Sequence, residues 1–239
     1  MKELLQRFAA WCGFFRCPLC MEHDGNGRNE ICPECRKTLK LLPAAGRCPG
    51  CGGINDSALA VCPGCMEFPM RTYIDAVAVM EYSGAGREMI RDMKFRNRPE
   101  FARPLAMLAV EKLNESAMPF DVIVPIPLHW QRKLRRSYNQ SELIASLIAA
   151  GTGKPLIHGL KKIQPTPRQA GLKRELRLKN LKRSLTVNDR SFAGKQILLV
   201  DDVLTTGTTL STAADILMKN GAAAVRIICC ARTPLKRSL

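Results

Sequence analysis

The sequence predicts an α/β fold, in which a mainly parallel sheet flanked by helices follows a small N-terminal, cysteine-rich, zinc-binding domain. Three observations lead to this prediction. Four Cys-x-x-Cys pairs lie near the start of the chain, strand-like and helix-like apolar segments alternate after Pro69, and 239 residues can bury one good core plus a small module. We therefore expect two domains, a zinc-ribbon-like domain at residues 1–70 and an α/β domain at residues 71–239.

The first segment, MKELLQRFAAWCGFF, predicts a short amphipathic helix. It carries Glu3 and Arg7 among its apolar residues and has no A-x-A-like cleavage site, so it is unlike a signal peptide. No apolar run approaches the roughly 18 residues needed to cross a bilayer. These features predict a cytoplasmic protein that does not insert into membranes.

The paired cysteines predict two structural zinc sites. Two residues between cysteines let a tight turn aim both sulfurs at one ion, and two such turns complete a tetrahedron. The total of 11 cysteines is odd, which argues against a disulfide scaffold, and a redox dithiol needs only one pair. An iron–sulfur cluster and a crossed pairing of the turns both stay open. The expected metal ligands are Cys17, Cys20, Cys32, Cys35, Cys48, Cys51, Cys62 and Cys65.

After Pro69, apolar periodicity predicts each element of the α/β domain in turn. Short apolar runs such as DVIVPIP and AVRIICCA predict strands, and apolar positions that share one helical face, such as Leu143, Ile144 and Leu147, predict helices. The expected strands cover 74–82, 121–127, 195–201 and 224–231. The expected helices cover 87–95, 104–114, 138–149 and a last segment that ends at Asn220, before Gly221.

The stretch LLVDDVLTTGTT predicts a site for a sugar phosphate. Strand ends carry ligands in parallel sheets, and Asp201 and Asp202 stand at such an end. Their carboxylates can accept hydrogen bonds from vicinal ribose hydroxyls. The backbone and hydroxyls that follow can bind a phosphate at a helix N-terminus. The expected phosphate-binding residues are Thr205, Thr206, Gly207, Thr208 and Thr209.

Positive charge is concentrated in one part of the chain. The net charge is +16, and residues 151–190 contain eleven Lys and Arg side chains against two acidic ones. Such a surplus favours a polyanionic partner such as single-stranded DNA, although a solvated basic loop would have the same composition.

The motif LLVDDVLTTGTT resembles the phosphoribosyl pyrophosphate (PRPP) motif of type I phosphoribosyltransferases. Together with the cysteine pairs, YSGAGREMIRDMKF, DVIVPIPLHWQRKLRRSYNQSELIA and TPRQAGLKRELRLKN, it makes the whole chain similar to the ComF family, also labelled GntX-like. The resemblance implies a type I phosphoribosyltransferase fold, PRPP bound with magnesium, and a role in DNA uptake during natural competence. Ser137 departs from the family, which more often has glycine there.

The resemblance also implies two loops around the ligand. Residues 124–140 correspond to the loop that holds pyrophosphate, and residues 160–184 to a hood that closes over the site; Lys94 is a further candidate for the same crevice. In the pyrophosphate loop the candidates are Pro127, His129, Arg132 and Arg136. In the hood they are Arg168, Gln169, Arg177 and Asn180, and Arg177 is a catalytic candidate together with Asp201 and Asp202.

Three functions follow as hypotheses. The first is a magnesium-PRPP-dependent protein of DNA uptake that transfers a 5-phosphoribosyl group to an unknown acceptor. The second is a non-catalytic PRPP sensor that binds single-stranded DNA, and the third is a nucleobase salvage phosphoribosyltransferase. Competence-machinery proteins are further expected partners.

Overall fold

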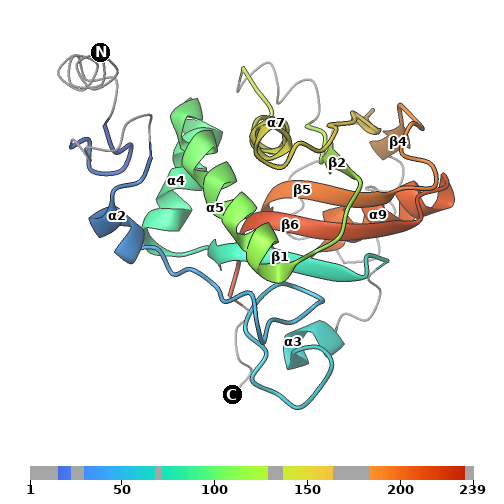
Figure 1. Ribbon diagram of the computed structural model, residues 1–239, viewed down its shortest axis with the longest axis horizontal. Coiled ribbons are helices and arrows are strands. Elements are labelled where there is room, and N and C mark those ends of the chain that lie inside the picture. The colour runs from blue at the N-terminus through green and yellow to red at the C-terminus, as the bar shows by residue number, and fades with distance from the viewer. Residues whose placement is uncertain (1–15, 23–29, 68–71, 129–136, 164–183, 235–239) are drawn as a thin grey trace.

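A parallel four-stranded sheet forms the centre of the molecule in the computed structural model, which describes residues 16–22, 30–67, 72–128, 137–163 and 184–234 (Figure 1). The strands lie in the order β1-β6-β5-β2, and every neighbouring pair is parallel. In chain order the elements are α2 (Pro33–Lys37), α3 (Pro63–Met66), β1 (Asp75–Glu81), α4 (Gly84–Phe95), η1 (Pro99–Phe101), α5 (Ala102–Ser116), β2 (Val122–Pro125), α7 (Gln140–Thr152), β3 (Leu160–Lys162), β4 (Leu185–Val187), β5 (Gln196–Leu204), α9 (Thr208–Lys219) and β6 (Ala224–Arg232).

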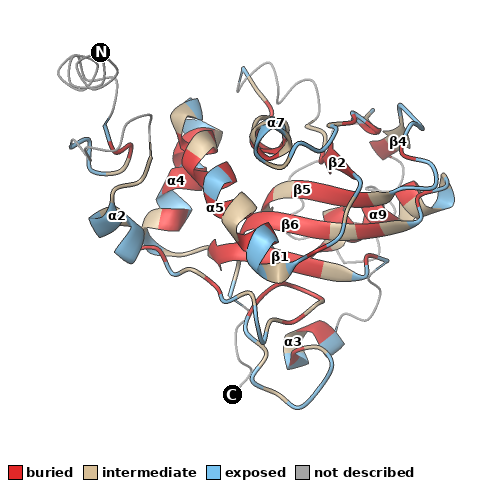
Figure 2. Ribbon diagram, in the orientation of Figure 1, coloured by how far each residue is buried: buried red, intermediate tan, exposed pale blue. Residues whose placement is uncertain are grey.

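The sheet is covered on both faces, as the apolar strand pattern predicts. One core cluster packs strand residues such as Val79 and Leu198 against α4, α5 and α7. A second packs the opposite strand faces, for example Ile197 and Ile227, against α9. Figure 2 shows the strands as buried along most of their length. The predicted fold class is therefore confirmed.

The cysteine-rich segment is joined to this sheet by hydrogen bonds and by a shared core. Leu42 donates its N–H to the carbonyl of Val79, and Glu81 donates to Lys40, so residues 40–42 run along the free edge of β1. Arg47 forms an ion pair with Asp75 at the start of the same strand. The division into domains at residues 1–70 and 71–239 stays a prediction.

Most element boundaries differ from the sequence-based expectation by one to three residues, and two of these differences lie near the site. Strand β5 continues past residue 201 to Leu204, because Val203 and Leu204 still pair with β6. Helix α4 begins at Gly84, inside the expected SGAG turn, with Ser83 as its N-cap residue. The short antiparallel pair of β3 and β4 was not expected within the basic stretch. The predicted N-terminal amphipathic helix lies in residues 1–15, outside the described part of the chain.

Candidate functional site

The two aspartates lie within β5, three and two residues before its end. This corrects the expectation that they end the strand. The hydroxyl of Ser141, in the first turn of α7, donates a 2.9 Å hydrogen bond to Asp201 Oδ1. The backbone N–H of Asp202 donates to the same oxygen at 2.9 Å. Lys94 Nζ, from the last turn of α4, lies 2.7 Å from Asp202 Oδ1. Helices α7 and α4, which pack on the same face of the sheet, therefore supply a hydroxyl to Asp201 and a cation to Asp202.

The electrostatics of the pair are uneven. Burial raises the pKa of Asp201 to about 7 from its ordinary value of 3.8, and the neighbouring charge of Asp202 adds to this effect. Lys94 and the hydrogen bonds from Ser141 and the Asp202 N–H oppose the rise in this pKa. Asp201 can therefore gain or lose a proton near neutral pH.

The loop after β5 forms a small polar pocket at the N-terminus of α9. Gly207 is the N-cap residue and has φ +73°, a left-handed conformation that glycine adopts without strain. Thr206 Oγ1 and Thr208 Oγ1 lie 2.8 Å apart. The first N–H groups of a helix have no acceptor within the helix, and the helix dipole adds partial positive charge. The pocket is lined by Asp201 and residues 203–210.

The expected pyrophosphate loop begins beside the aspartates. Pro125 of β2 pairs with Val200 of β5, and Ile126 donates its N–H to the Val200 carbonyl at 2.9 Å. Pro127 therefore follows at the same edge of the sheet as the aspartates. The buried Asn139 caps α7 and donates from Nδ2 to the Ile126 carbonyl at 2.9 Å, which ties the two ends of the loop together. His129, Arg132 and Arg136 lie outside the described residues.

Ser137, the departure from the family pattern, has φ +62°. This is the left-handed region, in which glycine is favoured over residues with a Cβ. The glycine that the family more often carries at this position thus has a conformational reason, and serine tolerates the same backbone at some cost.

The expected hood loop is closed at its base by β3 and β4. Leu160 pairs with Val187 and Lys162 with Leu185, so the two ends of the loop meet in an antiparallel ladder. The candidates within it, Arg168, Gln169, Arg177 and Asn180, lie outside the described residues. Their roles, like those of the other site residues, stay predictions.

Sequence reasoning missed one contact of the pair and left another open. Ser141 was not singled out, because its approach to Asp201 depends on how α7 packs on β5. Lys94 was a candidate for the crevice, and the structure places its ammonium on Asp202. The spacing of Met89, Ile90 and Met93, which are buried, identifies the inner face of α4 and would have placed Lys94 beside it.

The eight paired cysteines form two clusters of four, in chain order. The first cluster is Cys17, Cys20, Cys32 and Cys35, the second is Cys48, Cys51, Cys62 and Cys65, and the ligand atoms of each lie within 4.8 Å of one another. The crossed pairing is therefore wrong.

The sulfur geometry of both clusters fits a zinc ion. Four sulfurs at the usual 2.3 Å from zinc would be about 3.8 Å apart in a tetrahedron. In the first cluster, Cys20 Sγ lies 3.9 Å from Cys32 Sγ, and in the second, Cys51 Sγ lies 3.8 Å from Cys62 Sγ. Both clusters are thus compatible with two zinc ions.

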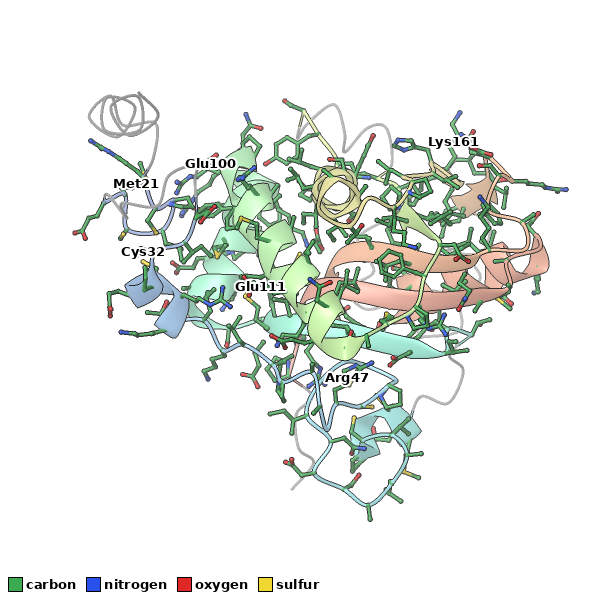
Figure 3. The ribbon with its side chains drawn as sticks, viewed as in Figure 1. Met21, Cys32, Arg47, Glu100, Glu111 and Lys161 are labelled. Atoms are coloured by element: carbon green, nitrogen blue, oxygen red, sulfur yellow. The ribbon has the colours of Figure 1, made fainter. Side chains whose placement is uncertain are left out.

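The two clusters are attached to the rest of the molecule in different ways. In Figure 3, Cys32 lies beside α2 at the margin of the molecule and Glu111 lies on α5. Arg36 of α2 makes a bidentate ion pair with Glu111, and Arg98 donates to the Pro18 carbonyl at 3.1 Å. The second cluster instead belongs to the hydrophobic core on the α9 face of the sheet.

No helix among the described residues combines the length and the apolar character needed to cross a membrane. The cytoplasmic location stays a prediction.

Comparison with known proteins agrees with this architecture. Residues 164–238 match the family model of the phosphoribosyl transferase domain. The DNA utilization protein YhgH of Escherichia coli K12 is 31% identical over 234 residues, which cover 93% of this chain and 96% of that protein. The YhgH protein of Salmonella typhi is 30% identical over 228 residues, with coverage of 93% and 96%. Competence protein F of Haemophilus influenzae is 29% identical over 222 residues, with coverage of 89% and 95%. With a phosphoribosyltransferase domain behind two four-cysteine clusters and this similarity over nearly its full length, the chain belongs to the ComF family of competence and DNA-utilization proteins.

Proposed function

We propose that the chain binds PRPP with magnesium and transfers its 5-phosphoribosyl group to an acceptor. One observation carries the proposal. A carboxylate pair, Asp201 and Asp202, comes shortly before a glycine-centred threonine loop at the N-terminus of α9. The pair and the loop lie at the same edge of the sheet. Carboxylates repel a phosphate, so a ligand that suits both groups must carry hydroxyls at one end and a phosphate at the other.

Each part of the ligand has a matching part of the site. The vicinal hydroxyls of the ribose would donate to the carboxylates of Asp201 and Asp202. The 5-phosphate would accept from the N–H groups and hydroxyls of Thr205–Thr209. Lys94 offsets the repulsion between the two neighbouring carboxylates through its ion pair with Asp202.

Magnesium would bind through oxygen atoms, and the carboxylates of the pair are ligands of the type it prefers. Bound to the pyrophosphate, it would neutralise part of the negative charge of this leaving group. The pyrophosphate would bind to the loop that starts at Pro127, with His129, Arg132 and Arg136 as its proposed contacts.

The transfer itself needs no redox step. The bond between the anomeric carbon and the pyrophosphate oxygen breaks, and pyrophosphate leaves with the electron pair. The acceptor bonds to the anomeric carbon and gives up a proton. The proposed hood, with Arg168, Gln169, Arg177 and Asn180, would exclude water, which would otherwise compete as the acceptor.

A second candidate function is PRPP sensing coupled to single-stranded DNA binding. The relatives are named DNA utilization protein and competence protein, which favours a nucleic-acid role, and the basic surplus in residues 151–190 agrees with it. Aromatic residues make up only 5% of the chain, so phosphate contacts would dominate over base stacking. No specific observation favours nucleobase salvage.

Calorimetric titration with magnesium and PRPP tests the proposal. Asp201→Asn and Asp202→Asn each remove a charge-assisted hydrogen bond worth about 1.5–3 kcal/mol, so each should weaken binding about tenfold or more. Gly207→Val should weaken it further, because a β-branched residue resists a φ of +73°. Asp215→Asn is the control. Asp215 lies on α9 and pairs with Lys219, so this variant should bind PRPP like the parent.

The absence of binding by the parent protein would overturn both candidate functions. Pyrophosphate release in the presence of nucleobases or single-stranded DNA identifies the transferase. Binding of PRPP without release, together with a DNA affinity that falls steeply as salt rises from 50 to 200 mM, identifies the sensor.

A further inference from the structure

The second cluster lies inside the molecule, whereas the first lies at its surface. Cys48, Cys51, Cys62 and Cys65 are all at most 8% exposed and pack in the same core as the strands and α9. In the first cluster Cys17 is buried, but Cys32 and Cys35 are half-buried and Cys20 is exposed. A metal bound at the second cluster would therefore be held in a low-dielectric environment, without water to screen its charge.

The turn that carries Cys48 and Cys51 lies directly against the sheet. Gly52 has φ +68°, and a Cβ built there would come within 2.3 Å of the backbone nitrogen of Ala78 in β1. A Cβ on Gly53 would come within 2.2 Å of Nη1 of Arg232. The two glycines thus bring this turn into contact with β1 on one side and with the Arg232 guanidinium on the other.

Arg232 is a buried cation without a carboxylate partner among the described residues. It is the last residue of β6, only 8% exposed, and its Nε has no hydrogen-bond acceptor in the described part of the structure. Its guanidinium lies against Gly53, two residues after Cys51. A buried charge is costly unless an opposite charge or hydrogen bonds compensate it.

A tetrathiolate zinc complex at the second cluster would supply that opposite charge. Four thiolates and one Zn²⁺ leave a net charge of about −2. The buried anion and the buried guanidinium, each unfavourable alone, would then compensate each other. We propose that Arg232 is the counter-ion of a tetrathiolate zinc site at the second cluster and that it holds the metal there.

The first cluster makes a useful contrast within the same chain. It also has four cysteine ligands, with similar sulfur spacing, but it is partly open to solvent. The arginines near it already have carboxylate partners: Arg36 pairs with Glu111, and Arg98 with Glu100. Its charge is screened by water. Loss of the Arg232 charge should therefore weaken zinc binding at the second cluster and leave zinc binding at the first cluster unchanged.

Zinc release to a chromogenic chelator, from the full-length protein, tests the proposal. Arg232→Met removes the charge and keeps an apolar stem of similar length. Outer partners of metal ligands typically contribute about 10–100-fold to metal affinity. We expect one of two zinc equivalents to leave at least about tenfold faster in this variant, and the other to leave at the parent rate. Arg226→Met is the matched control, since Arg226 lies at the other end of β6 and pairs with Gln196.

Two further variants make the result decisive. Cys20→Ser leaves only the second cluster with four thiolates, so Arg232→Met in that background reports on one site alone. Arg232→Lys keeps the charge and should hold zinc within about threefold of the parent, even if the methionine variant fails to fold. Parent-like release in Arg232→Met, equal acceleration in Arg226→Met, or a tenfold acceleration in Arg232→Lys would each overturn the proposal.

Discussion

At the residue scale, Asp201 combines a role in the candidate site with a cost to stability. Its carboxyl has a pKa of about 7 in the folded protein, against an ordinary value of 3.8. A raised carboxyl pKa means that folding favours the protonated form. The corresponding stability is fully present below about pH 4 and is lost as the pH rises through about 7.

Asp201→Asn should therefore stabilise the ligand-free protein at high pH. The amide has no charge to bury, so its advantage over the parent in free energy of unfolding should grow by about 1–3 kcal/mol between pH 5 and pH 8. Urea unfolding at the two values measures this difference. Asp215→Asn, which lies on α9 beside Lys219, should show no comparable growth. A pH-independent difference between parent and Asp201→Asn would mean that Asp201 is well solvated.

At the element scale, the sequence predicted most strands and helices because each has a strong apolar period. The observed boundaries differ from the predicted ones where tertiary contacts determine where an element begins or ends. Strand β5 runs through the aspartates because β6 offers pairing partners as far as Arg232. Helix α4 starts within a glycine-rich turn, and a Cβ on Gly86 in its first turn would come within 2.6 Å of the Met80 sulfur, so glycine is needed there for packing. Contacts such as that of Ser141 with Asp201 depend on helix packing and register, which no local pattern contains.

The turn of the second cluster needs glycine at position 52 for two reasons, a positive φ and a close approach to the backbone of β1. Gly46 shares only the first of these, so the two glycines allow the two effects to be measured separately. Gly46 and Gly52 have nearly equal positive φ values, +66° and +68°, but a Cβ at Gly46 would meet nothing within 4 Å. Gly46→Ala should thus cost only the backbone strain, about 1–3 kcal/mol. Gly52→Ala should cost clearly more, because the contact with the Ala78 backbone must also open. Thermal unfolding with zinc quantified in each variant measures both, and equal costs would show that the turn can move away from β1.

At the scale of the whole molecule, the two clusters contribute differently to folding. The first is attached through the ion pair of Arg36 with Glu111 of α5 and through a hydrogen bond from the Arg98 side chain to the Pro18 carbonyl, and the partly buried Leu19 and Ile31 of its segment pack against the core. The second shares the core of the sheet. Metal binding to such sites supplies folding free energy directly. The packing therefore leads to separate expectations for the two clusters.

Removing one ligand from each cluster tests this difference. Cys20→Ser should lose about one zinc equivalent and lower the free energy of unfolding of the sheet by less than Cys48→Ser does, since the segment of the first cluster adds mainly the partly buried Leu19 and Ile31 to the packing on the sheet. Cys48→Ser should lose the other equivalent and remove support from the face of β1 and β6, so amide protection in β5 and β6 should fall throughout. Hydrogen exchange read by mass spectrometry, with elemental analysis for zinc and iron, measures both effects. Unchanged protection of β5 and β6 in Cys48→Ser would show that the sheet folds independently of the second cluster. Iron with a visible absorption band in the parent would replace the zinc assignment with an iron site.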